Sequence, residues 1–313
     1  MSTRTTEEVF AHPALFYRSE REYTDRTVSF VREGLEAGEP VAVAVPGPNL
    51  ELIRAGLGAV RPQDVVFLDM TEAGRNPGRI IPGVLRRFAD QHAGARVRII
   101  GEPIWAGRSA AEYPACAQHE ALINAAFTGR PATILCPYDV SRLDAEVLAD
   151  ARRTHPTVVD EGREAASEAY DWPAVVARHN QPLTAPPDAA VFRFDAEGLP
   201  GARRFAVERA GSLELTERRL PDLELAVAEL TTNSVVHGGG LGTLAVWAEA
   251  GQVVCEVRDT GRLTDPLAGR RPPERGQIGG RGLLLVHYVA DLVRIHTSDE
   301  GTTVRFHLGA APA

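Results

Sequence analysis

Short apolar runs alternate with amphipathic segments along the first half of the chain. Four of these runs have the β-branched composition of buried strands: 40–46, 64–70, 96–102 and 132–139. Segments with the apolar spacing of helices lie between them: 49–57, 80–93 and 111–127. Strands that alternate with helices predict right-handed crossovers and a mainly parallel α/β sheet. In such sheets ligands bind at the carboxyl ends of the strands.

The pattern changes in the last third of the chain. Strands are predicted at 190–195, 243–250 and 252–260, with a closing hairpin that turns at Glu300–Gly301. Helices are predicted at 199–211, at 220–238 and from about Gly282 onward. This order predicts an α+β sandwich, with helices on one face of a mixed sheet.

A proline-rich stretch separates these two patterns. The segment NQPLTAPPD (180–188) has the composition of a linker. A chain of 313 residues is long enough for two ordinary cores. We therefore predict a first domain over 1–180, a linker over 181–189 and a second domain over 190–313.

Charge and composition exclude several classes of protein. The formal net charge of −8 disfavours a nucleic-acid partner, which would require a basic face. No apolar window reaches the length of a membrane span, and charges fall where a signal peptide would need its apolar region. Three widely spaced cysteines suit a reducing compartment. We expect a cytoplasmic protein with neither nucleic-acid nor membrane partners.

Three polar motifs follow one another in the second domain. Glu229 and Asn233 lie four residues apart and therefore share one helix face. RDTG (258–261) places an aspartate before a glycine turn, and GGRGLLLV (279–286) places glycines at a helix start, where bare N–H groups bind phosphate. Each motif alone also fits a solvated helix face or a turn. Their order favours an ATP site.

The first domain offers weaker signals. No GxxxxGK[ST] motif follows the first strand, so phosphate binding of the P-loop type is not expected. Cys116 and His119 share a helix face beside Glu120, and with His12 or Cys136 they could bind a metal or respond to oxidants. The alternative is a buried cysteine and a surface histidine.

Two aromatic residues of the first domain come at predicted strand ends. Trp105 follows the third strand in GEPIW, and Tyr138 ends the fourth in CPYD. Both could line an apolar ligand pocket.

The motifs resemble two known families. AELTTNSVVHGG, RDTG, GGRGL and GTTVRF are similar to the N, G1 and G2 boxes and the closing strand of GHKL (histidine kinase-like) ATPases, most of all the anti-sigma-factor serine kinases. HPALFYRSEREY, LDMTEAGRNPGRIIP, GEPIWAGRS, CAQHEALIN and CPYD resemble a MEDS sensory domain. The resemblance implies RecA-like or Rossmann-like layering in the first domain and sensing of small hydrocarbon derivatives.

The GHKL resemblance implies roles for individual residues. Glu229 would be the general base and Asn233 would hold Mg²⁺. Asp259 would accept a hydrogen bond from the adenine amine, Gly261 would allow close approach, and Thr302 would support the same ring edge.

The phosphates would lie at the G2 box. Gly280 and Gly282 would direct helix N–H groups to them, Leu283 follows in the same motif, and Arg281 would add charge. His237 lies near the face of Glu229 and could reach the phosphates or the sugar, or could cap the helix end.

One position departs from the family pattern. Many relatives have a second glycine in the G1 box where this chain has Leu263. The lid between 262 and 279 is short and rich in Arg, Pro and Gly. This departure points to a loosely held nucleotide, or to a lid that closes only with a partner.

The resemblance implies phosphorylation of a Ser or Thr on a STAS-type anti-sigma-factor antagonist, with a sigma factor as the other partner. One alternative is a non-catalytic module that sequesters a partner and uses nucleotide as a structural ligand. A second is a sensor histidine kinase, for which His155, His179 or HEALIN (119–124) would supply the acceptor. A homodimer is a further possibility. In each case the first domain would bias the second through the linker.

Overall fold

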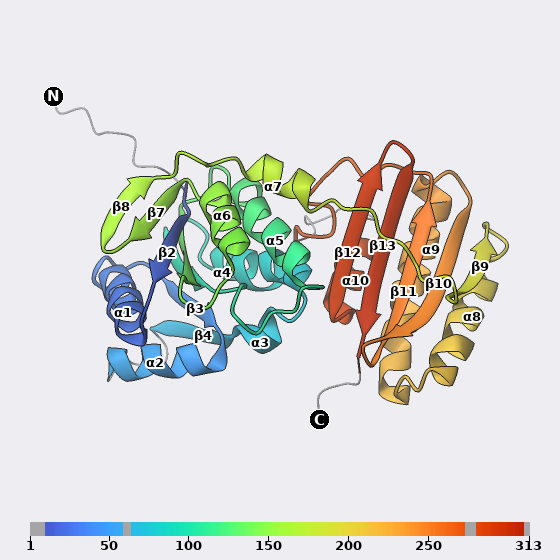
Figure 1. Ribbon diagram of the computed structural model, residues 1–313, viewed down its shortest axis with the longest axis horizontal. Helices are drawn as coiled ribbons and strands as arrows, with labels where there is room; N and C mark the ends of the chain where they lie inside the picture. The colour runs from blue at the N-terminus through green and yellow to red at the C-terminus, as the bar shows by residue number, and fades with distance from the viewer. Residues whose placement is uncertain (1–9, 59–63, 273–279, 310–313) are drawn as a thin grey trace. The chain divides into compact units, whose positions relative to one another are not determined.

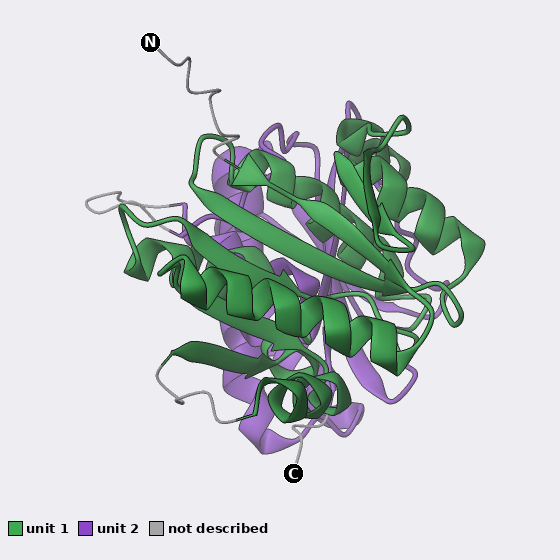
Figure 2. Cartoon of the chain, turned by 90° about the vertical axis from the view of Figure 1, so that its left-hand side faces the viewer, with its two compact units in different colours: residues 1–75, 80–179 green, residues 76–79, 180–313 purple. Residues whose placement is uncertain are grey.

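The computed structural model describes residues 10–58, 64–272 and 280–309 (Figure 1). The chain forms two compact units, which Figure 2 shows in different colours. Unit 1 comprises residues 1–75 and 80–179, and unit 2 comprises residues 180–313 together with the short segment 76–79.

Unit 1 is built on an eight-stranded sheet in the order β4-β3-β5-β6-β2-β7-β8, with β1 paired to β6. Its strands are β1 (Phe10–Ala11), β2 (Pro13–Tyr17), β3 (Val41–Val45), β4 (Val65–Asp69), β5 (Val97–Gly101), β6 (Ala132–Asp139), β7 (Thr157–Asp160) and β8 (Arg163–Ala166). All pairs are parallel except β7–β8. The mainly parallel sheet predicted from the sequence is confirmed, and the four predicted strands are β3, β4, β5 and β6.

Four strands of this sheet were not predicted. The strand β2 is five residues long, yet it lies inside the sheet between β6 and β7. The strands β1, β7 and β8 have two to four residues each. Runs this short carry too little periodicity to be distinguished from loops, and it is their pairing with distant strands that stabilises them.

Helices pack around the unit 1 sheet: α1 (Glu20–Glu36), α2 (Gly47–Leu57), α3 (Met70–Ala73), α4 (Arg86–Gln91), α5 (Tyr113–Ala126), α6 (Ala145–Thr154) and α7 (Trp172–Arg178). The hydroxyl of Ser19 caps α1 by accepting from Glu22 N, and a stripe that includes Tyr23, Val28 and Val31 is buried. The helix predicted at 80–93 is instead a π-helical turn, Ile81–Leu85, followed by α4. Pro82 stands in the first turn of this segment, where its missing N–H removes no helical hydrogen bond, so it is compatible with a helix start there.

Unit 2 has a five-stranded sheet in the order β12-β13-β11-β10-β9. Its elements are β9 (Ala190–Phe194), α8 (Leu199–Ser212), α9 (Leu220–His237), β10 (Gly242–Glu249), β11 (Gln252–Asp259), α10 (Gly282–Val289), β12 (Leu292–Ser298) and β13 (Gly301–Leu308). Every strand pair is antiparallel, so the predicted mixed sheet is corrected to an antiparallel one. Ala250 and Gly251 have φ of 50° and 75° in the β10–β11 turn, which matches the twist of a two-residue hairpin.

The two faces of this sheet are covered differently. One face packs against α8, α9 and α10 in a core that includes Leu223, Val257 and Phe306. On the other face, Ala185 and Ala189 of the linker pack against a small cluster around Trp247. The linker is therefore part of the unit 2 fold (Figure 1).

Candidate functional site

The helix α9 positions the first two candidate residues. Its stripe of Leu223, Ala226, Val227 and Leu230 is buried against the sheet. Glu229 and Asn233 occupy a neighbouring, partly exposed face one turn apart. A carboxylate and a carboxamide therefore lie side by side where solvent and ligands can reach them.

The first residue of α10 lies against this pair. A Cβ atom built on Gly282 would come 2.5 Å from Glu229 Oε2 and 3.1 Å from Asn233 Nδ2. Only a residue without a side chain fits there without displacing them. The first motif thus meets the glycine-led helix start of the third motif, which was predicted to bind phosphate.

Asp259 ends β11 at the other side of the site. Its Oδ2 accepts a hydrogen bond from Ser234 Oγ at 2.6 Å, and its Oδ1 accepts one from Gly261 N at 2.8 Å. A carboxylate has about four acceptor positions, so these two bonds fix its orientation and leave others for a ligand donor.

Thr302 supports the same turn from β13, where it pairs with Asp259. Its hydroxyl donates to Gly261 O at 2.7 Å and accepts from Leu263 N at 3.2 Å. The φ of Leu263 is negative, so this backbone does not require the glycine found in relatives. The leucine changes what fills the space and does not strain the chain.

A cavity of about 500 Å³ joins these parts. The candidate residues that line it are Asn233, His237, Asp259, Gly261, Gly280, Gly282, Leu283 and Thr302. Neither Glu229 nor Arg281 is among the lining residues. Glu229 lies beside one of them, Gly282, whereas Arg281 is exposed. Residues 273–279 of the lid lie outside the described residues.

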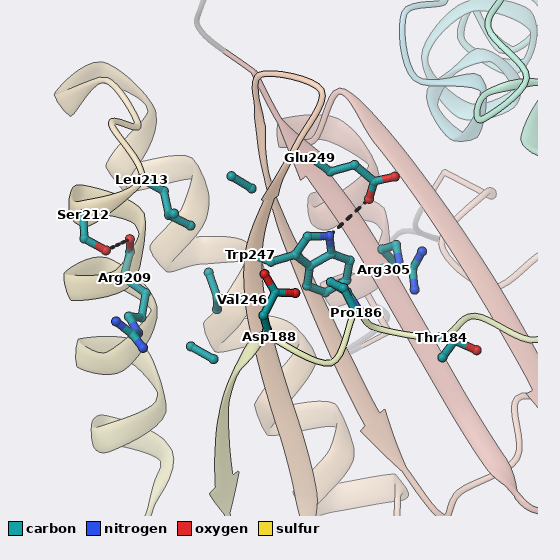
Figure 3. A pocket seen from close by; sticks show the side chains of 12 residues that line it. Thr184, Pro186, Asp188, Arg209, Ser212, Leu213, Val246, Trp247, Glu249 and Arg305 are labelled. Atoms are coloured by element: carbon teal, nitrogen blue, oxygen red, sulfur yellow. Dashed lines mark hydrogen bonds between the residues drawn. The ribbon is translucent and has the colours of Figure 1, made fainter.

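A larger cavity of about 570 Å³ lies in unit 2 between the linker, α8 and β10 (Figure 3). Thr184, Pro186 and Asp188 of the linker line it, and Trp247 donates from its indole N–H to Glu249. None of the candidate residues lines it. The site is therefore assigned to the smaller cavity, where the motifs converge.

In unit 1, four fully buried side chains come together, which we call the buried cluster. They are His12, Glu120, Cys136 and His155, and their potential ligand atoms all lie within 4.8 Å of one another. The candidates His12 and Cys136 thus meet, while Cys116 and His119 are buried on α5 and do not belong to this group. The interpretation of His119 as a surface residue was wrong, because only 1% of it is exposed.

The two aromatic candidates of unit 1 have different surroundings. Tyr138 is buried, and its ring packs edge-on against the ring of His155, with centroids 5.5 Å apart. Trp105 is partly exposed and lies under the guanidinium of Arg108, 4.0 Å from the ring centroid. The described contacts connect only Tyr138 to the buried cluster.

A second buried carboxylate lies at the carboxyl ends of the unit 1 strands. Glu102 follows β5 and accepts from Tyr23 Oη at 3.0 Å and from Asn49 Nδ2 at 2.8 Å. Burial raises the pKa of Glu102, these hydrogen bonds lower it, and the charge of Asp139 raises it. Burial is the largest effect, and the resulting pKa is about 8.

Comparison with known families agrees with this division of the chain. A model of the family MEDS, the "MEthanogen/methylotroph, DcmR Sensory domain", matches residues 11–156. A model described as "Histidine kinase-like ATPase domain" matches residues 192–308. The chain is a MEDS domain followed by a histidine kinase-like ATPase domain.

Among solved structures, the chain is similar to the RsbU and RsbW domains of Rv1364c from Mycobacterium tuberculosis, at 18% identity and a TM-score of 0.29. The match covers 40% of this chain and 34% of that one, so the chain spans about a third of its length. The Acinetobacter baumannii histidine kinase AdeS is similar at 11% identity over 64% of this chain and 96% of that one, with a TM-score of 0.24. No curated protein matches the chain. Among the described residues, no helix is both long and apolar enough to cross a membrane.

The histidines weighed as phosphate acceptors are all inaccessible. His119, His155 and His179 of the MEDS unit are each no more than 4% exposed. His179 Nε2 lies 2.8 Å from Asp150 Oδ2, and His155 Nδ1 lies 2.8 Å from Ala151 O. An acceptor must reach the γ-phosphate of a bound nucleotide, and these rings are held inside the fold.

Sequence reasoning did not connect His155 with His12. Each is followed by proline: Pro13 is the first residue of β2, and Pro156 directly precedes β7. These two strands are parallel neighbours, with Pro13 paired to Thr157. The repeated HP dipeptide was the available signal, because it marks the starts of two neighbouring parallel strands, which lie at the same end of the sheet.

Proposed function

We propose that the ATPase domain binds Mg²⁺-ATP and transfers the γ-phosphoryl group to a Ser or Thr hydroxyl of a STAS-type anti-sigma-factor antagonist. The observation that carries the proposal is the meeting of Gly282 with Glu229 and Asn233. It brings a carboxylate, a carboxamide and a glycine-led helix start together beside one cavity. A sigma factor would be the second partner, and the MEDS domain would modulate the switch between them.

The residues present fit a magnesium ion. Asn233 offers a carboxamide oxygen, and the absent side chain of Gly282 leaves room beside it that a Cβ would fill. When bound, Mg²⁺ would offset the negative charge of the nucleotide phosphates. Asn233 would hold the ion.

The remaining groups bind, orient and move a proton. Asp259, already fixed by Ser234 and Gly261, would accept from the exocyclic amine of adenine. The first N–H groups of α10 have no partner within the helix and would donate to phosphate. Glu229 would accept the proton of the attacking hydroxyl as the new O–P bond forms and ADP leaves.

Two features favour an acceptor on a separate protein. The candidate histidines of the MEDS unit are buried. A carboxylate base is also suited to a neutral hydroxyl, which must lose a proton in order to attack. These features support a Ser or Thr acceptor over autophosphorylation on histidine.

The test follows radiolabel from γ-labelled ATP to a purified candidate antagonist. Glu229→Gln keeps the side-chain shape but removes the base, so transfer should fall about 100-fold or more. Glu224→Gln is the matched control, because Glu224 lies on the same helix, is exposed and borders no part of the cavity. Normal transfer by Glu229→Gln would show that the base is assigned wrongly.

A non-catalytic sequestration module is the second candidate. Its support is Leu263, which lines the nucleotide cavity where many relatives have glycine. Under this alternative Mg²⁺-ATP would raise the melting temperature of the chain, and label would reach no antagonist. Transfer that depends on Glu229 would exclude it.

A further inference from the structure

The buried cluster brings together four side chains from four separate segments of the MEDS domain. His12 lies between β1 and β2, Glu120 lies on α5, Cys136 on β6, and His155 at the end of α6. Cys136 Sγ is 3.4 Å from His12 Nε2, and Glu120 Oε2 is 3.5 Å from His12 Nε2 and 3.1 Å from His155 Nε2. Each of the four residues is at most 1% exposed.

Neighbouring groups fix the orientation of both imidazoles. Asn124 Nδ2 donates to the carbonyl oxygens of Ala121 and Thr154, at 3.1 and 2.8 Å, so the opposite end of its amide is the oxygen. That oxygen lies 3.2 Å from His12 Nδ1, which must therefore carry the hydrogen. The lone pair of neutral His12 is then on Nε2, directed into the cluster.

His155 is held in the same way. Its Nδ1 lies 2.8 Å from the carbonyl oxygen of Ala151, which can only accept, so Nδ1 is the donor. In the neutral ring the lone pair is then on Nε2, which lies 3.1 Å from Glu120 Oε2. In metal-binding histidines, one ring N–H donates a hydrogen bond to a carbonyl or amide oxygen, and the lone pair of the other ring nitrogen binds the metal.

The cluster does not satisfy its own polar atoms. Among the described residues, neither carboxylate oxygen of Glu120 has a hydrogen-bond partner, and neither does Nε2 of His155. Glu120 Oε2 and His155 Nε2 lie 3.1 Å apart but are not aligned for a hydrogen bond. Buried polar atoms without partners are costly, and a shared ligand would remove that cost.

We propose that the MEDS domain binds one zinc ion through four side chains: His12 Nε2, Glu120, Cys136 Sγ and His155 Nε2. Zinc takes nitrogen, sulfur and oxygen ligands in tetrahedral sites, where bonds near 2.0–2.3 Å place ligand atoms about 3.3–3.8 Å apart. Three of the six separations between these atoms, 3.1–3.5 Å, are close to that range, and all four ligand atoms lie within 4.8 Å of one another.

Charge also balances in the occupied site. The Cys136 thiol loses its proton to solvent on binding, so thiolate and carboxylate together offset the two charges of the ion. With four protein ligands and no exposed face, the site is of the closed, structural type rather than the open, catalytic type. The ion would join β6, α5 and the starts of β2 and β7.

The first experiment measures metal content by mass spectrometry in the full chain, purified after zinc supplementation. One zinc per chain is expected in the wild type and in Cys116→Ala, the control for a buried thiol of α5 outside the cluster. Cys136→Ala and Glu120→Gln should each reduce zinc to background. Glu120→Gln preserves side-chain shape and so remains informative if Cys136→Ala does not fold.

A second experiment replaces zinc with cobalt(II) and reads its absorption spectrum. A thiolate-to-cobalt charge-transfer band is expected in the wild type and in Cys116→Ala, and not in Cys136→Ala. Asn124→Ala should keep the band but weaken zinc affinity about 10–100-fold in competition with a chelator, because it removes the group that orients His12. Wild-type protein without zinc and without this band, or zinc that persists in both Cys136→Ala and Glu120→Gln, would overturn the proposal and leave the cluster as a buried ion pair.

Discussion

The ATPase domain and the MEDS domain differ in the exposure and the hydrogen bonding of their candidate carboxylates. In the ATPase domain, Asn233 and Asp259 line an open cavity and Glu229 is partly exposed beside it, and the carboxylate of Asp259 is already hydrogen bonded by the chain itself. In the MEDS domain, Glu102 and Glu120 are each at most 2% exposed. One site is complete before its ligand arrives, whereas the other leaves buried atoms unpaired.

This difference determines how a ligand would enter and leave each site. A partly exposed cavity with pre-oriented acceptors can bind and release a nucleotide without unfolding, since its polar groups are stable in water. A closed cluster would take up its ion as the chain folds, because opening it exposes the core of the sheet. The predictions below test this contrast, from the largest expected effect to the smallest.

The first prediction concerns Glu102, whose pKa is raised by burial from 4.5 to about 8. The folded state binds this proton more tightly than the unfolded state. The associated stability is therefore fully present below about pH 4.5 and is lost as pH rises to about 8. The loss should reach at most roughly 5 kcal/mol, measured by urea unfolding of the full chain across this interval.

Glu102→Gln should flatten that pH dependence, because the amide does not ionise. Glu164→Gln, an exposed position of β8, is the control and should leave it unchanged. Equal slopes for the wild type and Glu102→Gln would contradict the contrast between buried and open carboxylates.

The second prediction concerns Asp259→Asn in the ATPase domain. The change removes the charged acceptor proposed for the adenine amine, so nucleotide affinity should fall by about 1.5–3 kcal/mol, roughly 10–100-fold. Titration calorimetry with an ATP analogue would measure it. Glu208→Gln is the control, because Glu208 is an exposed carboxylate on α8 and does not line this cavity. An unaltered affinity in Asp259→Asn would place the adenine elsewhere.

The third prediction tests how closely the backbone packs around the same aspartate. A Cβ on Gly261 would lie 2.6 Å from His237 O and 2.7 Å from the Cα of Gly238, and backbone atoms cannot easily move. Gly261→Ala should therefore cost about 1–3 kcal/mol of unfolding free energy. Thermal and urea denaturation would both report the loss.

Gly211→Ala is the matched comparison in the same unit. No atom lies within 4 Å of a Cβ built there, and the position is helical and exposed. That variant should be neutral or gain up to about 1 kcal/mol. A similar loss in both variants would mean that the turn at Gly261 is not tightly packed.

The two sites also differ in how far the sequence predicted them. The nucleotide site depends on contiguous motifs, and in each of them spacing along a helix or a turn determines geometry. Glu229 and Asn233, or Asp259 and Gly261, are neighbours in both sequence and space. The role assignments made from these motifs stay predictions, but the residues converge as their spacing requires.

The buried cluster could not be derived in that way. Its members come from β6, α5 and two segments that precede parallel strands, and only the pairing of β2 with both β6 and β7 brings them together. Local periodicity carries no information on which distant strands pair. The same limit explains why the short strand β2 was missed and why Cys116 was preferred to His155 as a partner for Cys136.

The docked linker has a practical consequence for separating the two domains. Asn180 donates to Thr297 O and accepts from Thr297 N, and Ala185 covers the ring of Trp247. A fragment beginning at 188 would strip both contacts, uncovering an indole that is now 7% exposed and an edge of β12. Aggregation or poor expression of that fragment would then be mistaken for a regulatory effect of the missing MEDS domain. A fragment that begins just before Asn180 keeps this face of the sheet covered and is the better form of the isolated ATPase domain.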